Sequence, residues 1–452
     1  MTLHNDIFSI PVGDKLGAGK EDYHLVYSPL AEELMLLSSE QLDELEAAFE
    51  GGGSSPDMAE TVTELTSYDP LEGRRDQILS TNDFVTLYVL PNYICNFKCS
   101  YCFAAHGRDT ARLDIGALKN MLDWMLDCNR TQYRKIYVTF LGGGEPMLSY
   151  ETMQEAILYA NKKADESGFE IEWSVVTNGS LIAREQLLFF KAEHVLPRYS
   201  FEIIERIQNL QRGNYEAVDA SVREACEVGL SPVIRSMITP DNVELLEEMV
   251  RITADRYPNV KVLKFDPVTD AEMGADVERF EAFNKKYYAH FMAARTLGIE
   301  LGIDVQCVVI RNLDTVIRRF CAGEISLNGY GEITACHRVS SPREAHYEEM
   351  KYGRATAEGV YIDHDRFKEI TSDTVDRKPE CADCFLKYNC AGGCWAQNLQ
   401  YSEEMKAVVC RYNRKMSRDI LFERVDDQVR AESGLSLLEL VSQGTEKNVN
   451  YE

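Results

Sequence analysis

The sequence lacks the long apolar runs and the excess of basic residues that mark membrane-spanning and nucleic-acid-binding proteins. No stretch approaches the roughly 18 apolar residues needed to cross a bilayer, and Met1–Ile7 shows no basic segment followed by an apolar one. Lys and Arg number 48 against 74 Asp and Glu, a net charge of −26. Such a field repels phosphate backbones and anionic membranes. We therefore expect a cytoplasmic protein with neither nucleic acid nor a membrane as partner.

The chain is long enough for a large core, and it is rich in cysteine. Its 452 residues leave room for two or three domains, and 45% hydrophobic with 27% charged residues is ordinary for a globular protein. Thirteen cysteines in a chain without an export signal favour metal binding over disulfide bonds.

Three cysteines, Cys95, Cys99 and Cys102, follow an alternating apolar run over Phe84–Leu90 that predicts a strand. Thiolates are the usual ligands of iron–sulfur clusters and of structural zinc. A cubane has four irons, so three cysteines leave one iron free to bind a small molecule. Structural zinc needs a fourth ligand, for which His106 is the only nearby candidate. The spacing favours the cluster.

Strand–helix units repeat from residue 84 to about 265. Alternating apolar runs predict six strands, over residues 84–90, 135–141, 171–177, 198–204, 231–237 and 260–265. Helical spacing predicts helices over residues 115–127, 150–166 and 186–194. Such units predict an α/β fold with a parallel sheet curled into a partial, open (β/α)6 barrel of the TIM type. Chemistry in such barrels lies at the carboxyl ends of strands, where the cysteine loop falls.

Polar, glycine-rich loops follow the second and third predicted strands. Gly143 and Gly144 would let the backbone approach a ligand closely, and Glu145 could accept a hydrogen bond from a ligand ammonium. Thr177 and Asn178 follow the third strand, where polar side chains could bind hydroxyl groups. Plain turns are the alternative for both loops.

The remaining cysteines gather after residue 306. They are Cys321, Cys336, Cys381, Cys384, Cys390, Cys394 and Cys410. The Cys-x2-Cys-x5-Cys-x3-Cys block alone would suit a zinc knuckle, but seven cysteines exceed the ligand set of one zinc ion. Cys128 and Cys226 fall on predicted helices, and we expect both to be buried as small apolar residues.

The motif from Cys95 to Cys102, with Tyr101 before its last cysteine, resembles the signature of the radical S-adenosylmethionine (SAM) enzymes. The resemblance implies a 4Fe–4S cluster on these three thiols, with the open iron chelated by SAM. It also implies a set of SAM contacts. The backbone of Tyr101 would contact adenine, the Gly143, Gly144 and Glu145 motif the amino group, and Thr177 with Asn178 the ribose. Ser200, Glu202 and Arg235 would contact the ribose or the methionyl carboxylate. An ordinary surface ion pair is the alternative for Arg235.

The C-terminal cysteines resemble those of the SPASM domain, which holds two auxiliary 4Fe–4S clusters. The resemblance implies one cluster on Cys381, Cys384, Cys390 and Cys410, and another on Cys321, Cys336 and Cys394. Cys307 could be an eighth ligand, but it precedes Cys321 by 14 residues, so we favour an open iron in the second auxiliary cluster. The expected cofactors are three 4Fe–4S clusters and SAM.

Four regions are expected along the chain: an N-terminal α+β module over residues 1–80, the barrel over 81–305, the cysteine-rich SPASM domain over 306–412 and a helical tail over 413–452. In the first, we expect strands over Tyr23–Tyr27 and Glu33–Leu37, a helix over Ser39–Phe49 and a flexible break over Gly51–Pro56. In the tail, we expect helices over 418–428 and 435–442 and a disordered end. The N-terminal module either holds a leader peptide as an extra strand, as related modules do, or merely caps the barrel.

The resemblance implies an enzyme that reductively cleaves SAM and abstracts hydrogen from a substrate; it names no catalytic side chain. Our first hypothesis is maturation of a ribosomally synthesised precursor peptide by a thioether or carbon–carbon crosslink, with flavodoxin or ferredoxin as reductant. The alternative is an anaerobic sulfatase-maturating enzyme that makes formylglycine. Those enzymes carry Asp after the cysteine matching Cys336, where this chain has His337. A third hypothesis, from another class, is a non-catalytic metal-cluster scaffold that binds a peptide.

Overall fold

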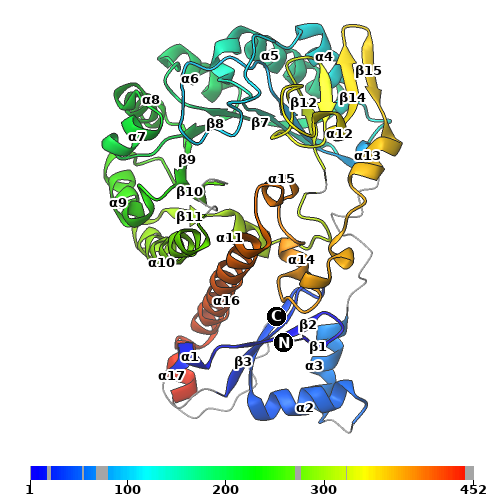
Figure 1. The fold of residues 1–452 in the computed structure, drawn as a ribbon, viewed down its shortest axis with the longest axis vertical. Helices are drawn as coiled ribbons and strands as arrows, with labels where there is room; N and C mark the ends of the chain where they lie inside the picture. Colours follow the sequence, from blue (N-terminus) through cyan, green and yellow to red (C-terminus); the bar gives the residue numbers. More distant parts are fainter. Residues whose placement is uncertain are drawn as a thin grey trace.

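The computed structural model describes residues 2–17, 22–52, 55–67, 80–269, 276–321 and 323–442 of the chain. A large curved sheet with helices on its outer face lies at one end, a small antiparallel sheet lies at the other, and the long helix α16 (Glu403–Ser433) runs between them (Figure 1). Within the described ranges, no helix combines the length and the apolar character that a membrane span requires.

The large sheet has 11 strands among the described residues, in the order β11-β10-β9-β8-β7-β6-β5-β12-β13-β14-β15. Neighbouring strands from β11 to β12 in this order are parallel, and β12 to β15 pair antiparallel. The strand bounds are β5 Thr86–Val89, β6 Lys135–Phe140, β7 Glu170–Thr177, β8 Val195–Ser200, β9 Val233–Ile238, β10 Val262–Pro267, β11 Asp304–Gln306, β12 Ile325–Leu327, β13 Glu332–Thr334, β14 Lys351–Thr356 and β15 Gly359–Ile362.

All six predicted strands are present as β5 to β10, which confirms the α/β class and the partial barrel. The fourth strand differs most, because β8 begins at Val195 and ends at Ser200. The chain turns immediately afterwards, and Ile203 takes a positive φ of 64° that no strand residue adopts. Glu202 therefore lies in the loop after β8. The extra strands β11 and β12 have three residues each, too few to produce an alternating pattern.

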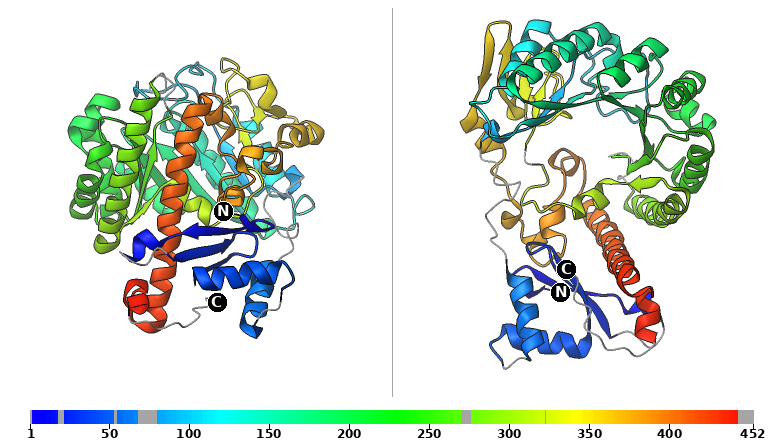
Figure 2. Two further views of the ribbon diagram at one scale, coloured as in Figure 1. Left: turned by 60° about the horizontal axis from the view of Figure 1, so that its bottom comes forward. Right: turned by 180° about the vertical axis from the view of Figure 1, so that it is seen from behind.

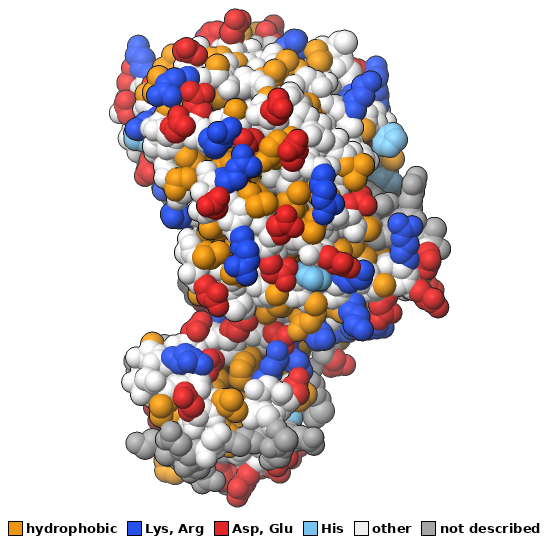
Figure 3. Space-filling view, turned by 90° about the vertical axis from the view of Figure 1, so that its left-hand side faces the viewer, with side chains coloured by type: hydrophobic (Ala, Val, Ile, Leu, Met, Phe, Trp, Pro, Cys, Tyr) orange, Lys and Arg blue, Asp and Glu red, His pale blue; other side chains and the backbone are white. Residues whose placement is uncertain are grey.

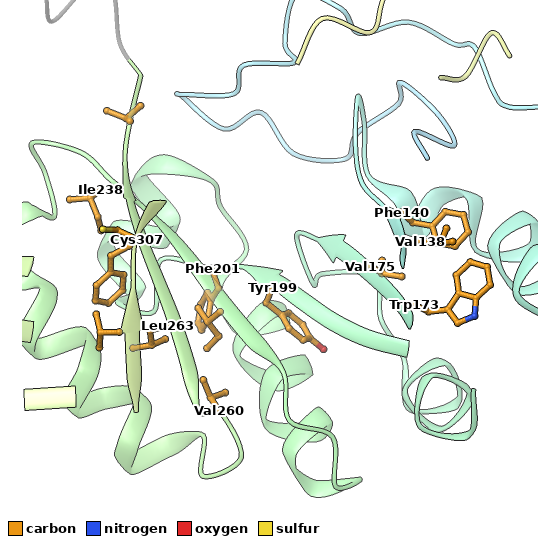
Figure 4. Close-up of a cluster of buried hydrophobic side chains, with 14 of the residues drawn as sticks. Val138, Phe140, Trp173, Val175, Tyr199, Phe201, Ile238, Val260, Leu263 and Cys307 are labelled. Carbon is orange, nitrogen blue, oxygen red and sulfur yellow. The ribbon is translucent and has the colours of Figure 1, made fainter. Parts of the chain in front are cut away.

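Helices cover the outer face of the parallel strands because each has one apolar side. The predicted helix over 115–127 is α4, in which Leu118, Met121 and Leu122 are fully buried. These side chains belong to the same buried apolar cluster as strand side chains such as Tyr199 and Leu263, which Figure 4 shows. Charged side chains of both signs are interspersed over the outward surface of these helices (Figure 3). The helices of this region are α4 Ile115–Met125, α5 Tyr150–Ser167, α6 Arg184–Ala192, α7 Glu205–Gln211, α8 Tyr215–Glu227, α9 Leu246–Arg256, α10 Val277–Leu301 and α11 Val308–Leu313.

Short helices and one very long one make up the C-terminal region. The helix predicted over 418–428 is part of α16, which Ser402 caps at the start and Gly434 ends in the left-handed conformation. The remaining elements here are α12 Tyr347–Met350, α13 His364–Ile370, α14 Lys387–Cys390, α15 Trp395–Asn398 and α17 Leu437–Ser442. Short 3-10 helices span Thr81–Asp83, Pro146–Ser149, Val243–Leu245, Val375–Arg377 and Pro379–Cys381. The end predicted to be disordered, beyond residue 442, lies outside the described residues.

The N-terminal sheet has the order β1-β2-β3-β4 and is antiparallel. Its elements are β1 Thr2–His4, β2 Ile7–Pro11, α1 Gly13–Leu16, β3 Tyr23–Ser28, β4 Glu33–Ser38, α2 Ser39–Phe49 and α3 Pro56–Thr66. The two strands and the helix predicted here are confirmed, but β1, β2 and α3 were not foreseen. Ser38 caps α2 through a capping box with Gln41. Part of the predicted break, residues 53–54, lies outside the described ranges.

Polar contacts attach this small sheet to the rest of the molecule. Lys387 and Tyr388 on α14 bond to the Asp6 carboxylate at 2.7 and 2.8 Å. Lys15 pairs with Asp419 on α16 at 2.9 Å. The views in Figure 2 show the sheet beside α16 and close to the loops that carry the later cysteines.

Candidate active site and thiol groups

The loop after β5 brings Cys95, Cys99 and Cys102 together, partly buried and free of disulfides. Burial raises the pKa of Cys95 and of Cys99, and the neighbouring thiols oppose ionisation further. The Arg108 guanidinium lowers the pKa of both thiols. It donates to the Phe97 carbonyl at 2.8 Å and to Cys102 Sγ at 3.5 Å.

The glycines after β6 pack against this cysteine loop. A Cβ on Gly143 would lie 2.2 Å from Cδ1 of Tyr93, and one on Gly144 would lie 2.0 Å from the Ile94 carbonyl oxygen. Backbone hydrogen bonds join the two loops, including one from Glu145 N–H to the Ile94 carbonyl at 2.8 Å. The close approach allowed by these glycines therefore serves first to hold the β5 and β6 loops together.

Glu145 joins the loops after β6 and β7. Its carboxylate accepts from Thr177 Oγ1 at 2.6 Å, from Asn178 N–H at 2.8 Å and from Met147 N–H at 3.1 Å. Burial raises the pKa of Glu145, and these donors oppose that rise. The Asn178 amide also donates to Asn96 in the cysteine loop at 2.8 Å. The structure thus brings three predicted site residues, Glu145, Thr177 and Asn178, into one network.

A second network surrounds Glu202, which is fully buried. Tyr101 and Ser236 donate short hydrogen bonds to its carboxylate, and Arg212 lies 3.7 Å away and donates to Tyr101 Oη at 2.8 Å. Burial raises the pKa of Glu202, while Arg212 opposes that rise. The sequence identified Tyr101 and Glu202 but missed Arg212 and Ser236. Neither Arg212 nor Ser236 belongs to a sequence motif, so nothing in the sequence marked them as site residues.

Ser200 and Arg235 lie opposite each other in the register of β8 and β9. The Arg235 side chain is 50% exposed and pairs with Asp266 on β10 at 3.1 Å. This is the ion pair that the sequence left open as the alternative to a contact with the SAM carboxylate.

The later cysteines form two groups. Electrostatic interactions couple Cys321 and Cys336 with each other and with Cys394. A separate set of interactions couples Cys381, Cys384, Cys390 and Cys410. The two sets are the ones implied by the resemblance to the SPASM domain.

The later thiols are poorly solvated and repel one another when ionised. Burial, with a smaller contribution from Glu380 and neighbouring thiols, raises the pKa of Cys381 to about 11. Burial and neighbouring thiols together raise the pKa of Cys390 to about 12. Burial and the Glu324 carboxylate raise the pKa of Cys321 to about 12. Such thiols stay protonated at neutral pH, and a bound cation would favour their ionised form.

The other cysteines lie apart from these groups. Cys307 is buried beside Met416, with 3.6 Å between the two sulfur atoms, and lies in the cluster of apolar side chains drawn in Figure 4. Cys226 is buried, as predicted. The prediction for Cys128 is wrong, because α4 ends at Met125 and leaves this thiol exposed.

The donor set fits iron–sulfur clusters. In the part of the chain that the structure describes, no three His, Cys, Asp or Glu side chains are arranged to hold a single metal ion, as a closed zinc site requires. Ligands of one cubane bind different irons and stand further apart. Arg108 Nε and Arg212 Nε, both buried near the first thiols, have no hydrogen-bond partner. Buried cationic donors of this kind fit an anionic group between those thiols.

Comparison with known proteins agrees with this chemistry. Residues 89–253 match the radical SAM superfamily. The radical SAM cyclopropyl synthase TigE of Paramaledivibacter caminithermalis is 21% identical over 73% of this chain and 72% of its own length. A cysteine-type anaerobic sulfatase-maturating enzyme of Clostridium novyi is 19% identical over 66% and 84%. An S-adenosylmethionine-dependent nucleotide dehydratase of Psychrobacter lutiphocae is 25% identical, but the match spans only 27% of this chain and 42% of that relative.

Solved structures share the fold. The anSMEcpe structure with bound AdoMet and the Kp18Cys peptide aligns with a TM-score of 0.62 at 17% identity, over 76% of this chain and 99% of that one. Streptococcus suis SuiB bound to precursor peptide SuiA aligns with a TM-score of 0.52 at 13% identity, over 88% and 98%. Together with the cysteine loop after β5, these matches show that residues 89–253 form a radical SAM domain, and the chain shares its fold with anSMEcpe and SuiB.

Proposed function

We propose that this enzyme matures a ribosomally synthesised precursor peptide by installing a thioether or carbon–carbon crosslink. The observation that carries the proposal is the separation of the seven later thiols into a group of four and a group of three. Two auxiliary clusters need such a division. Support also comes from SuiB, which shares the fold and was solved with a precursor peptide.

Three 4Fe–4S clusters and SAM would occupy the sites described above. Cys95, Cys99 and Cys102 would hold the cluster that binds SAM, with Arg108 and Arg212 balancing its negative charge. Bound SAM and a reduced cluster would supply radical chemistry: reductive cleavage of SAM and hydrogen abstraction from the peptide. The proposed SAM contacts are Tyr101, Gly143, Gly144, Glu145, Thr177, Asn178, Ser200, Glu202 and Arg235.

The networks around Glu145 and Glu202 would keep this site rigid. Each carboxylate ties together loops from different strands, so the SAM-binding face is fixed before the cofactor arrives. The N-terminal sheet would hold a leader peptide at one of its edges, β1 or β4, by strand addition. We further propose a cytoplasmic location and a flavodoxin or ferredoxin as electron donor.

Sulfatase maturation is the second candidate, because the Clostridium novyi relative matches over 84% of its length. At the position where those enzymes carry Asp, His337 donates its backbone N–H to the Glu324 carboxylate at 2.9 Å, and its ring nitrogen Nδ1 lies 2.9 Å from the same carboxylate. A crosslinked peptide that loses two hydrogens and carries no aldehyde would support the first candidate. Formylglycine in a sulfatase peptide would support the second.

The test begins with iron and SAM cleavage. Anaerobic reconstitution should give about twelve irons per chain with broad absorbance near roughly 400 nm, and SAM with dithionite should yield 5′-deoxyadenosine. The Cys99→Ala variant should lose cleavage and retain its fold. The matched control is Cys128→Ala, which removes an exposed thiol outside the groups. An iron-free protein that does not cleave SAM would refute the proposal and leave the non-catalytic metal scaffold. Cleavage that survives Cys99→Ala would refute the assignment of Cys99 to the SAM-binding cluster.

A further inference from the structure

Basic side chains gather on the inner face of the large sheet. Arg198 on β8, Arg235 on β9 and Lys264 on β10 occupy neighbouring strands, and Arg235 lies directly opposite Lys264 in the register. Each alternates along its strand with a residue that is fully buried under the outer helices. Those residues are Tyr199, Ile234 and Leu263, two of which are labelled in Figure 4. The basic side chains therefore face the opposite, inner side.

Only one of these cations is neutralised by a described residue. Arg235 pairs with Asp266 at 3.1 Å. Arg198 and Lys264 form no hydrogen bond or ion pair with any side chain in the described ranges, and neither does Arg311 on α11. Arg198 Nε is buried and has no hydrogen-bond partner. Unpaired, half-buried cations that lie together raise the free energy of the folded protein, although the chain as a whole carries a net charge of −26. An anionic ligand would lower that free energy.

Charge crowding is visible at Lys264. Burial, followed by repulsion from Arg311, Arg198 and Arg235, lowers its pKa to about 8, although Asp266 opposes this fall. Burial and Arg311 also lower the pKa of Arg198. A negative charge brought close to such an amine would raise its pKa.

The basic group lies near Tyr88 on β5, which interacts electrostatically with Arg198 and Arg311 and also with Glu324 and Cys321. Ser200, a proposed SAM contact, is two residues from Arg198 along the same face of β8. A substrate held here would be close to both centres.

We propose that Arg198, Lys264 and Arg311 bind the side-chain carboxylate of an acidic residue, Asp or Glu, in the peptide substrate. Guanidinium groups offer paired N–H donors that match a carboxylate, and the ammonium adds a point charge. The proposal rests on the proposed function, because it takes a peptide as the substrate. It adds to that function a requirement on sequence, namely an acidic residue near the modified position.

The test measures the acylation of Lys264 in the anaerobically reconstituted enzyme, with SAM present throughout. A lysine of lowered pKa reacts readily with a water-soluble N-hydroxysuccinimide ester at pH about 8, and mass spectrometry quantifies the adduct. The probes are two capped tripeptides, acetyl-Gly-Glu-Gly-amide and acetyl-Gly-Gln-Gly-amide. Lys261, exposed at the start of the same segment, is the internal control.

The glutamyl peptide should slow acylation of Lys264 by about fivefold, as a charge-assisted contact of ordinary strength would. It should leave Lys261 unchanged, and the glutaminyl peptide should have no effect on either lysine. Arg198→Gln should abolish protection. The peptide acetyl-Gly-Gly-Gly, which has a free C-terminal carboxylate, tests whether the basic group binds a chain end rather than a side chain. If it protects Lys264 more strongly than the glutamyl peptide does, the assignment to Asp or Glu is wrong.

Equal protection by the glutamine peptide would overturn the proposal. Complete protection of Lys264 from acylation by SAM alone would also overturn it, because the basic group would then belong to the cofactor. Stronger protection by inorganic phosphate than by the glutamyl peptide would overturn it as well. A Lys264 that reacts no faster than Lys261 would contradict the charge crowding on which the argument stands. Because acylation requires no turnover, failure here leaves the test by 5′-deoxyadenosine formation untouched, and loss of SAM cleavage leaves the acylation result interpretable.

Discussion

Replacing Arg212 by Met should destabilise the barrel, because it leaves the Glu202 carboxylate buried without its cation. Glu202 is fully buried, Arg212 is only 9% exposed, and their charged atoms lie 3.7 Å apart. At an effective dielectric constant near 20, that separation corresponds to about 4 kcal/mol, and removal of one partner from a buried pair typically costs about 3–5 kcal/mol. The hydrogen bonds from Tyr101 and Ser236 remain, so we expect about 3 kcal/mol.

The effect should depend on pH in a defined direction. Burial raises the pKa of Glu202 in the folded protein. At a pH above this raised pKa the carboxylate is ionised and lowers the stability of the fold. As the pH falls below the raised pKa, Glu202 is protonated and the loss of stability disappears. Loss of Arg212 raises the pKa of Glu202 further. The difference in unfolding free energy between wild type and Arg212→Met should therefore be largest at neutral pH and shrink on acidification.

Urea titrations, followed by pulsed hydrogen exchange of the β8 and β9 segments, measure this difference locally. The control is the double variant Arg212→Met/Glu202→Gln, which removes both charges and should recover most of the lost stability. A cost under about 1 kcal/mol, or a double variant no more stable than the single one, would refute the network as a source of stability.

Three further predictions concern packing, charge and metal content. Gly143→Ala should lower the free energy of unfolding by about 1–3 kcal/mol, because the new methyl group would overlap the Tyr93 ring; an unchanged urea midpoint would show that the loops can separate freely. Lys264→Met should raise stability at neutral pH by about 1 kcal/mol after allowance for solvent screening. The pKa of Lys264 in the folded protein is about 8, below its ordinary value, so the charged amine destabilises the fold. The stability gained by Lys264→Met should therefore fade as the pH rises above about 8. If thermal unfolding shows that the variant is less stable instead, Lys264 has a partner. Cys410→Ala should remove about four of roughly twelve irons, whereas Cys128→Ala should remove none; full iron content in Cys410→Ala would exclude this thiol as a ligand.

The strands of the barrel were predictable because each alternates between a helix-covered face and an inner face. The run at 135–141 predicted β6 to within one residue. The fourth strand was misplaced because Phe201, Ile203 and Ile204 are still apolar after the strand has ended. The chain turns at Ile203, where no Gly or Pro indicates a turn. Helix α16 was predicted too short because its buried positions are spread over 31 residues without a continuous apolar stripe.

The site was predictable only where its residues are close in sequence. The short motif over Cys381–Cys394 drew attention to the later thiols, but their division into two groups came from the resemblance to the SPASM domain, because Cys321, Cys336 and Cys410 lie outside that motif. Arg108 and Arg212 had no such spacing, although both lie beside the first thiols. The basic group was also invisible, since Arg198, Lys264 and Arg311 come together through strand register and a crossover rather than through a motif.

Helix α16 has a consequence for the order in which the protein is made. Synthesis delivers Cys95, Cys99 and Cys102 early, within a single loop, but the group of four waits for Cys410, which arrives on this late helix. Until α16 docks against α10 and α11, iron that reaches Cys381, Cys384 and Cys390 meets an incomplete set of thiols. The same helix carries Asp419, the partner of Lys15 in the N-terminal module. If the proposed cluster forms on these four thiols, its assembly would have to wait for α16, and chains that stall before this point should be the ones most exposed to oxygen and to the wrong metal.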